Sequence, residues 1–326
     1  MAILYRLALA VATLSAGTAA AQTTLDFSTP WGENNFQAKA AREFARSVGE
    51  ATDGNVQINV LNAGEIGVSG SQSMAAVETG IVQMADFLLF QQAGEERLLA
   101  IDTLPYLIQG QEEMAAFLEV ASPVFDEIAA RHNQKILYYV PWPSPGLFSE
   151  FEISTPEDLQ GRRIRAFNPG SFEFLRRLGA APLEMPWGDV VPALAAGTID
   201  GVATSTSSGV IGKLWDMTPY FSPLQWSTST DVVTVNLDAW NALSEDDRAA
   251  IEGVAETLVA KFWAQSAAED AANTEILIEN GITVLTPQDS LKAAMYEAGR
   301  GMWDTYIGRI PAAEPIIREY AAAVGK

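Results

Sequence analysis

Three arginines in one short stretch are the side chains best suited to chemistry. Arg162, Arg163 and Arg165 lie in a segment that leads into a strand predicted over residues 159–166, and a helix is predicted from Ser171. A guanidinium binds a carboxylate through two parallel hydrogen bonds, and a helix N-terminus adds N–H dipoles. Because side chains alternate along a strand, Arg163 and Arg165 share a face, and the pattern does not choose between them. The stretch is compatible with an anion site or with three surface charges.

The chain lacks the residues that most catalytic sites require. There is no Cys and only one His, so thiol chemistry, Cys-ligated metals and a catalytic triad have little support. We interpret His132, at the end of a polar helix, as a solvated residue favoured by the helix dipole. No glycine-rich nucleotide motif is present. We therefore expect no enzyme activity, no cofactor and no bound metal.

Adjacent acids occur at two places that could be read as catalytic. Glu157-Asp158 follows Thr155-Pro156, and Glu245-Asp246-Asp247 follows Ser244. A glycosidase needs two carboxylates placed across a cleft, one of them in an apolar setting. Acids directly after a Ser or Thr cap instead complement the dipole at a helix start. We favour this capping interpretation.

Aromatic residues in predicted loops could form the body of a binding site. Four of the eight tryptophans stand beside Pro, Gly or Ser: Trp31, Trp142, Trp187 and Trp226. Loop aromatics stack on ligands or close clefts, but anchoring each loop to a core explains any single one equally well. Phe90, next to an apolar strand predicted over residues 87–89, is a further candidate contact.

The elements that must position these residues alternate between strands and helices. Strands are predicted over residues 25–28, 56–60, 87–89, 135–140, 159–166, 182–185, 199–204, 231–236 and 281–285. Helices are predicted over residues 34–50, 71–79, 112–131, 171–178, 189–196 and 244–280, and in the C-terminal region. This order is typical of α/β lobes with largely parallel sheets. The Pro-rich residues 141–146 are predicted to cross between two lobes, leaving a cleft where small ligands bind.

Length and charge narrow the class of partner. With 326 residues the chain is long enough for two domains. It carries 20 basic and 41 acidic residues, for a net charge of −21. Such a chain repels nucleic acids and anionic lipid surfaces, so neither is expected as a partner.

The N-terminus has the pattern of an export signal. Arg6 precedes an apolar run over residues 7–16, and Ala19-Ala20-Ala21 fits a small-residue cleavage site. The run is well short of the roughly 20 residues that a membrane span needs. We therefore expect residues 1–21 to be removed before Gln22 and the mature chain to be periplasmic.

Six segments, in order along the chain, carry a family resemblance. They are EATDGNV (50–56, pattern E-x-T-x-G-x-I/V), NAGEIG (62–67, pattern P-x-G-x-L-G with the Pro replaced), DTLPYL (102–107, pattern LPF), STPEDLQGRRIR (154–165, pattern s-P-x-D-L-x-G-x-K-I/F-R), ALAAGTIDG (193–201, pattern A-L-x-x-G-x-I/V-D-G/A) and NLDAWNAL (236–243, pattern N-x-x-x-W-x-x-L). Together they resemble the solute-binding proteins of tripartite ATP-independent periplasmic (TRAP) transporters. The resemblance covers nearly the whole mature chain.

The resemblance implies a fold and its division into lobes. The expected fold is α/β, two-lobed and periplasmic-binding-protein-like, with mixed sheets flanked by helices, a ligand cleft between the lobes and a long bracing helix. We expect lobe I to comprise residues 22–142 and 231–270, and lobe II to comprise residues 143–230 and 271–326.

The resemblance also implies roles for site residues. Arg165 would grip a ligand carboxylate, Phe167 and Asn168 would line the cleft, and Thr204 and Ser205 would offer polar groups. Some relatives that bind sugar acids have a second arginine, whereas residues 144–147 here carry no cation. This fits a monocarboxylate with an aromatic or apolar body, packed on Trp142, Trp187 or Trp226.

The expected function is therefore capture of a small organic acid for import. The partners would be two integral-membrane transporter subunits, one small and one large, and the binding protein would be a monomer. A binding protein that feeds a sensor or another importer is the alternative. A hydrolase working with carboxylates alone is less expected, because no facing acid pair is evident from the sequence.

Overall fold

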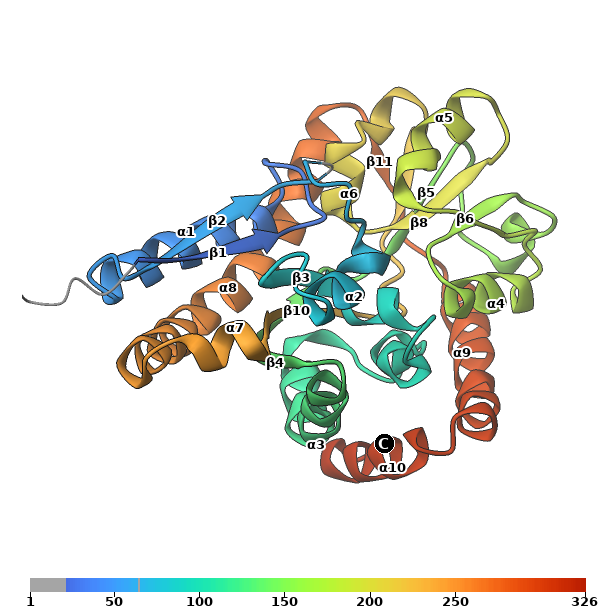
Figure 1. Cartoon of the computed structure of the whole chain (residues 1–326). Coiled ribbons are helices and arrows are strands. Elements are labelled where there is room, and N and C mark those ends of the chain that lie inside the picture. Colours follow the sequence, from blue (N-terminus) through green and yellow to red (C-terminus); the bar gives the residue numbers. More distant parts are fainter. Residues whose placement is uncertain (1–21, 64) are drawn as a thin grey trace, which may run out of the picture.

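Two mixed β-sheets, each covered by helices on both faces, form the computed structural model, which describes residues 22–63 and 65–326 (Figure 1). The expected signal peptide lies outside the described residues. We call the five-stranded sheet with its helices the first lobe and the six-stranded sheet with its helices the second lobe. The expected two-lobed α/β fold is confirmed.

The first sheet has the strand order β2–β1–β3–β10–β4. Its strands are β1 (Thr23–Ser28), β2 (Val56–Leu61), β3 (Met84–Leu88), β4 (Gln134–Trp142) and β10 (Ser229–Asn236). β1 is parallel to β2 and β3, whereas β10 is antiparallel to both of its neighbours, β3 and β4. One strand therefore runs against the other four.

The second sheet has the order β11–β9–β5–β8–β6–β7. Its strands are β5 (Gly146–Ser149), β6 (Ile164–Ala166), β7 (Leu183–Glu184), β8 (Gly201–Thr204), β9 (Tyr220–Ser222) and β11 (Thr283–Val284). Among the described residues, 22–63 and 65–326, β5 is the only strand of this sheet that is antiparallel to both of its neighbours, β8 and β9.

The reversed strand of each sheet is the one that enters from the other lobe. β4 ends at Trp142 in the first sheet and β5 begins at Gly146 in the second, as the predicted crossover requires. The return crossing runs from β9, ending at Ser222, to β10, beginning at Ser229. A strand that arrives from the facing lobe starts where the parallel strands end, so it must run against them. This is why the sheets are mixed rather than wholly parallel.

Helices cover both faces of the first sheet. α1 (Phe36–Ala51) and the first part of α8 (Glu245–Glu279) share a core on one face, together with the side chains of β1 and β4. α2 (Ser73–Glu78) and α3 (Gly110–Arg131) share the core on the other face. The short α7 (Leu237–Ala242) follows β10 directly.

The last helix, α10 (Ala313–Val324), packs on the first lobe (Figure 1). Ile316, Ile317 and Tyr320 share a core with Phe117 of α3. The Tyr320 hydroxyl also donates a hydrogen bond of 3.1 Å to the carbonyl of Leu107. The expected placement of the whole segment 271–326 in lobe II therefore does not fit this helix, because its apolar face is buried against α3.

The second sheet is covered by four shorter helices and by the end of α8. α4 (Pro169–Arg177) and α9 (Asp289–Arg309) share the core on one face. The side chains of α5 (Val190–Ala195) and α6 (Thr206–Ile211), together with Leu277 of α8, lie on the other side. The cores of the two faces are thus separated by the sheet.

The long helix α8 joins the two lobes, as the predicted bracing helix over residues 244–280 would. Its 35 residues correspond to about 50 Å at 1.5 Å per residue. Ile251 lies in the core of the first lobe and Leu277 in that of the second. Ser244 caps its start by accepting a hydrogen bond from the Asp247 N–H at 3.0 Å, with three acids in the first turn. The capping interpretation of this acidic run is confirmed.

The other acidic pair also caps a helix start. Asp158 lies in a single 3-10 turn (Pro156–Leu159) and accepts hydrogen bonds from the N–H groups of Ser154 and Thr155 at 2.9 and 2.7 Å.

Among the described residues, no helix has the length and apolar character needed to cross a membrane.

Candidate functional site

Arg165 lies inside the protein on β6, between β8 and the edge strand β7 of the second sheet. β6 pairs with β8 in a register that sets Arg165 opposite Val202, and only 5% of the residue is exposed. Its Nε donates to the carbonyl of Met185 and its Nη1 to the carbonyl of Ala203, each at 3.1 Å. Neither bond uses Nη2. The two carbonyls therefore orient the guanidinium and leave part of its donor fork for another partner.

The charge of Arg165 has no counter-ion within ion-pair distance among the residues that the structure describes. Burial lowers the pKa of its guanidinium to about 10, against the weaker effect of Glu184. The group is still a cation at neutral pH. Since a buried charge without a partner is costly, this arrangement favours binding of an anion.

The other two arginines of the stretch are surface residues. Arg163 stands just before β6, pairs with the carboxylate of Asp200 and donates from Nη1 to the Gly197 carbonyl at 2.8 Å. The guanidinium carbon of Arg162 lies 4.1 Å from the ring centroid of Phe151. The structure thus distinguishes buried Arg165 from the other two arginines, which the sequence pattern could not do.

Phe167 and Asn168 follow β6 and touch the first lobe. Asn168 caps α4 through its Oδ1, which accepts from the Ser171 N–H at 2.7 Å, and its Nδ2 donates to Thr103 Oγ1 at 3.2 Å. The ring of Phe167 lies 5.6 Å from that of Phe90. Both residues are at the boundary between the lobes, but the Asn168 side chain is already occupied by protein contacts.

Thr204 and Ser205 stand where β8 ends and α6 begins, directly after the carbonyl that holds Arg165. Ser205 caps α6 by accepting from the Ser208 N–H at 3.3 Å. Its Oγ also accepts from Trp142 Nε1 at 3.2 Å, which ties β8 to the end of β4. Thr204 is 7% exposed. This segment therefore brings polar groups next to both Arg165 and the crossover.

Aromatic side chains gather at the strand ends of the first lobe that face the second. The ring centroid of Trp142 lies 4.5 Å from that of Trp31 and 5.0 Å from that of Phe36. Leu88 and Phe90 pack against the same group. We call Trp31, Phe36 and Trp142 the aromatic cluster.

The other two candidate tryptophans, Trp187 and Trp226, have different surroundings. The ring centroid of Trp187 lies 6.0 Å from the guanidinium carbon of Arg165, within reach of the same site. Trp226 is only 1% exposed and lies 5.5 Å from Phe174 in a core of the second lobe. Trp226 therefore anchors its loop to a core, and we do not retain it as a ligand contact.

Two buried acids beside the aromatic cluster were not identified from the sequence. Asp86 and Asp231 are 2% and 1% exposed. Thr29 Oγ1 donates to Asp86 Oδ2, and Trp31 Nε1 donates to Asp231 Oδ2, both at 3.2 Å. A usable signal existed, because each Asp stands beside apolar residues in a strand in which every residue is buried.

The environment of these two acids disfavours their charged forms. Burial raises the pKa of Asp86 and of Asp231, and the nearby charge of Asp86 raises that of Asp231 further. The Oδ1 of Asp86 is buried without a hydrogen-bond partner among residues 22–63 and 65–326. The pair therefore lacks part of the donor set that two carboxylates would need.

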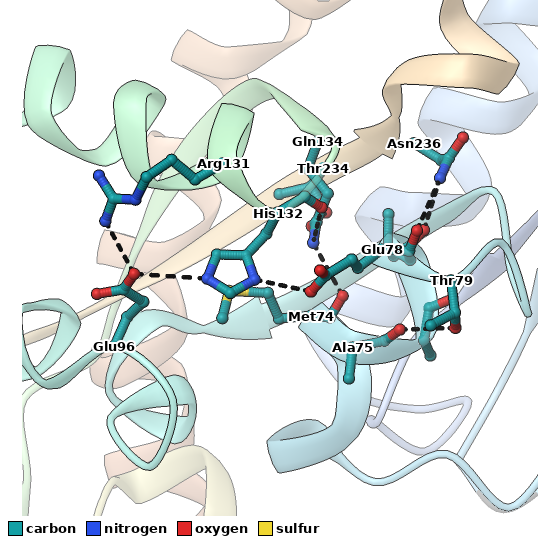
Figure 2. Close-up of polar contacts among 12 residues, drawn as sticks. Met74, Ala75, Glu78, Thr79, Glu96, Arg131, His132, Gln134, Thr234 and Asn236 are labelled. Carbon is teal, nitrogen blue, oxygen red and sulfur yellow. Dashed lines mark hydrogen bonds and ion pairs between the residues drawn. The ribbon is translucent and has the colours of Figure 1, made fainter.

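His132 lies at the end of α3, as predicted, but it is not solvated (Figure 2). Its Nδ1 is 2.7 Å from Glu78 Oε2 and its Nε2 is 3.5 Å from Glu96 Oε1, while Arg131 Nη2 is 2.8 Å from the same Glu96 oxygen. The side chain is only 20% exposed. The residue thus joins three segments through ion pairs.

The same region contains a group of residues with ligand atoms suited to a metal. Glu78, Glu95 and His132 can bring one such atom each within 4.8 Å of the others. Glu78 is already hydrogen-bonded to His132, as Figure 2 shows, and we assign the group no metal.

An apolar groove lies elsewhere on the first lobe. A groove of about 780 Å³ lies between α3, β4 and α8, with mainly apolar walls that include Leu118, Ile136, Val259 and Trp263. None of the candidate site residues lines it. β4 is an edge strand of its sheet, and the groove follows that edge.

Comparison with known sequences gives one family and several distant relatives. Residues 27–309 match the family described as bacterial extracellular solute-binding protein, family 7. The ectoine-binding periplasmic protein TeaA of Halomonas elongata is 27% identical over 233 residues, covering 69% of this chain and 66% of TeaA. The ectoine/5-hydroxyectoine-binding protein UehA of Ruegeria pomeroyi is 25% identical over 290 residues, covering 84% of this chain and 83% of UehA.

Solved structures with the same fold have similarly low identity. The extracytoplasmic solute receptor DctP6 of Bordetella pertussis, which binds pyroglutamic acid, superposes with a TM-score of 0.87 at 24% identity, covering 92% of this chain and 100% of the receptor. A TRAP periplasmic solute-binding protein of Chromohalobacter salexigens with bound D-glucuronate gives a TM-score of 0.84 at 20% identity, covering 92% and 99%.

Proposed function

The chain belongs to family 7 of the bacterial extracellular solute-binding proteins, which includes the extracytoplasmic receptors of TRAP transporters, and we propose that it captures a small organic monocarboxylate with an aromatic or apolar body. One observation carries the proposal. Arg165 is a buried cation held by two backbone carbonyls and without an ion-pair partner in the described chain. A ligand carboxylate would supply that partner.

The contacts between the lobes suggest how binding and closure are coupled. Phe167 meets Phe90, Asn168 meets Thr103, and Ser205 meets Trp142. Each contact joins a residue next to β6 or β8 to one in the first lobe. Closing around a carboxylate removes water from the Arg165 ion pair, and a charge pair is stronger in a less polar surrounding. Ligand binding and lobe closure would therefore favour each other.

The chemistry of the relatives supports a carboxylate. Pyroglutamic acid and D-glucuronate, bound by two proteins of this fold, are both monocarboxylates. Residues 144–147 carry no second cation, and aromatic rings stand beside the arginine and along the crossover. These features favour one carboxylate on a largely apolar body over a dianion.

The proposed partners follow from the family. We propose that the mature protein is a periplasmic monomer that delivers its ligand to one small and one large integral-membrane subunit. Delivery to a sensor or another importer is the alternative, and the neighbouring genes distinguish the two. The buried acids do not favour a hydrolase, because Asp86 and Asp231 lie on adjacent strands of one sheet rather than across a cleft.

A thermal-shift screen tests the proposal. A ligand that binds only the folded state raises the melting temperature by mass action. We expect stabilisation by some aromatic, hydroxy, oxo or sugar acids, and none by the methyl ester of the same acid. Stabilisation by neutral sugars, with none by any acid, would overturn the assignment of Arg165 as a carboxylate site.

A further inference from the structure

We propose that the ligand carries a positively charged nitrogen as well as its carboxylate, and that Asp86 and Asp231 bind this nitrogen beside the aromatic cluster. The proposal rests on the proposed function, because Arg165 must hold the other end of the same molecule. It narrows the ligand class from monocarboxylates to zwitterions.

The two acids share one face of the first sheet near its boundary with the second lobe. Asp86 of β3 is paired with Val233 of β10, and Asp231 lies two residues before Val233. Paired residues and residues two apart on a strand point to the same side, so both carboxylates lie on one face. Asp86 is two residues from the end of β3 and Asp231 is two from the start of β10, and β10 begins where the chain arrives from the second lobe.

The hydrogen bonds of the pair leave room for a cationic partner. Thr29 and Trp31 each donate to one oxygen, Asp86 Oδ2 and Asp231 Oδ2. Asp86 is only 2% exposed, and its Oδ1 has no hydrogen-bond partner in the described part of the chain. An ammonium or amidinium group supplies the missing donors, and its positive charge favours the ionised carboxylates that burial alone disfavours.

A continuous series of contacts joins these acids to Arg165. Asp231 accepts from Trp31, whose ring lies 4.5 Å from that of Trp142. Trp142 donates to Ser205, which stands two residues after the carbonyl of Ala203 that holds the Arg165 guanidinium. The acids and the arginine are therefore the two ends of one connected group of side chains.

The indole rings between the two ends suit a cation as well as an apolar body. The face of an indole attracts a positive charge, and the attraction is greater when water is excluded. A zwitterion could place its carboxylate on Arg165 and its nitrogen against the acids and the indoles. An acid without nitrogen would leave the carboxyl pair with its unpaired oxygen.

Matched pairs of acids test the proposal directly. 6-Aminohexanoic acid and hexanoic acid share a chain and a carboxylate, but only the first carries a charged nitrogen, at the end remote from the carboxylate. Trans-4-(aminomethyl)cyclohexanecarboxylic acid and trans-4-methylcyclohexanecarboxylic acid, and 4-(aminomethyl)benzoic acid and 4-methylbenzoic acid, extend the series with a ring between the two charged groups. In calorimetry with the full mature chain, we expect the nitrogen-bearing member of each pair that binds to be about tenfold tighter or more, the effect of one charge-assisted hydrogen bond.

The outcomes separate this proposal from the proposed function. Equal or tighter binding of the nitrogen-free acids, with loss of that binding in Arg165→Ala, would retain the carboxylate site and overturn the nitrogen site. Absence of binding by every acid would count against both.

Substitution of one acid tests the assignment to these residues. Asp231→Asn keeps the shape of the side chain and the acceptor for Trp31, and we expect it to weaken binding of a nitrogen-bearing acid about tenfold while sparing its nitrogen-free partner. Asp86→Asn provides a second variant should the first fail to fold.

Asp102→Asn is the matched control for both variants. Asp102 is equally buried, also has an unpaired oxygen among the described residues, and accepts from the Thr230 N–H at 2.7 Å. It belongs to a segment whose neighbours pack in the core on the other face of the sheet. We expect the control to keep the preference for nitrogen. Equal loss of both ligands in Asp231→Asn would show a structural role only and overturn the proposal.

Discussion

At the scale of single residues, two arginines that are two positions apart in the sequence have opposite environments. Arg163 is neutralised at the surface by Asp200, 37 residues away, whereas in the described part of the chain Arg165 has only backbone carbonyls as hydrogen-bond partners. A surface ion pair contributes little to stability, and a buried uncompensated charge opposes it. The position of Arg165 is therefore best explained by binding rather than by folding.

Replacing Arg165 should separate binding from stability. Arg165→Ala is expected to weaken binding of a stabilising acid by about 2–5 kcal/mol, the cost of removing one partner of a buried charge pair. Arg165→Lys should also lose affinity, because an ammonium cannot reproduce the guanidinium fork. Calorimetry measures both, with Arg163→Ala as the control, which should bind normally. Unchanged affinity in Arg165→Ala would show that the carboxylate binds elsewhere.

His132 should make stability depend on pH. Partial burial lowers the pKa of its imidazole, but hydrogen bonds and charges from Glu78 and Glu96 outweigh it and raise the pKa above the ordinary 6.5. The ion pairs therefore stabilise the folded protein fully below about pH 6.5, and their contribution is lost as pH rises through the higher folded value.

The free energy of unfolding, measured by urea titration across this range, tests that sign. Wild type should exceed His132→Gln by up to about 1 kcal/mol at low pH, and the difference should shrink as pH rises. A difference that grows with pH would show that His132 is neutral in the folded state.

At the scale of elements, long and periodic segments were predictable and short buried ones were not. The predicted helix over 244–280 and the strand over 56–60 agree with α8 and β2 within one residue at each end. Four short elements, β5, α6, β9 and α7, were not predicted. β5 has four residues, all of them buried, so it shows neither alternation nor a helical period.

The candidate site was predictable to a similar extent. The candidate anion-binding stretch was evident from its residue types, but the choice of Arg165 depends on Asp200 and on carbonyls from β8 and Met185, which no local pattern encodes. The core position of Trp226 likewise depends on Phe174, 52 positions away in the printed sequence. Contacts between distant segments decide these roles.

The crossover into β5 requires a glycine at its first position. A Cβ on Gly146 would stand 2.6 Å from the carbonyl oxygen of Ser222 and still closer to the ring of Phe221. Gly146→Ala should therefore lower the free energy of unfolding by about 1–3 kcal/mol through overpacking. Gly253→Ala, within α8 with open space around the new Cβ, should raise it by about 0.5–1 kcal/mol. Denaturant titration of both variants checks the opposite signs.

At the scale of the whole molecule, rigid and flexible connections between the lobes have different roles. α8 places side chains in the cores of both lobes, and α9 does the same through Met295 and Trp303. The two extended crossings are the segments able to bend.

The net charge of −21 does not prevent anion binding, because salt screens distant charges over roughly 8–10 Å while Arg165 acts at contact.

Contacts that cross between the lobes should control the fraction of closed molecules. Thr103 Oγ1 accepts from Asn168 Nδ2 of the other lobe at 3.2 Å. Thr103→Val keeps the side-chain shape but leaves that buried amide without its partner, which opposes the closed form by about 1–3 kcal/mol. Because ligand binds with an affinity proportional to the closed fraction, binding should weaken by severalfold or more with Arg165 intact.

Solution scattering and calorimetry together test this effect of Thr103. The ligand-free variant should have a larger radius of gyration than wild type, and saturating ligand should bring the two to the same value, because the ligand favours the closed form in both. Thr257→Val is the control, since its hydroxyl donates only within α8, to the Gly253 carbonyl at 2.7 Å. A Thr103→Val protein with weaker binding but an unchanged radius in both states would mean that Thr103 acts on the ligand site locally, and closure would then have to depend on the Phe90–Phe167 and Trp142–Ser205 contacts instead.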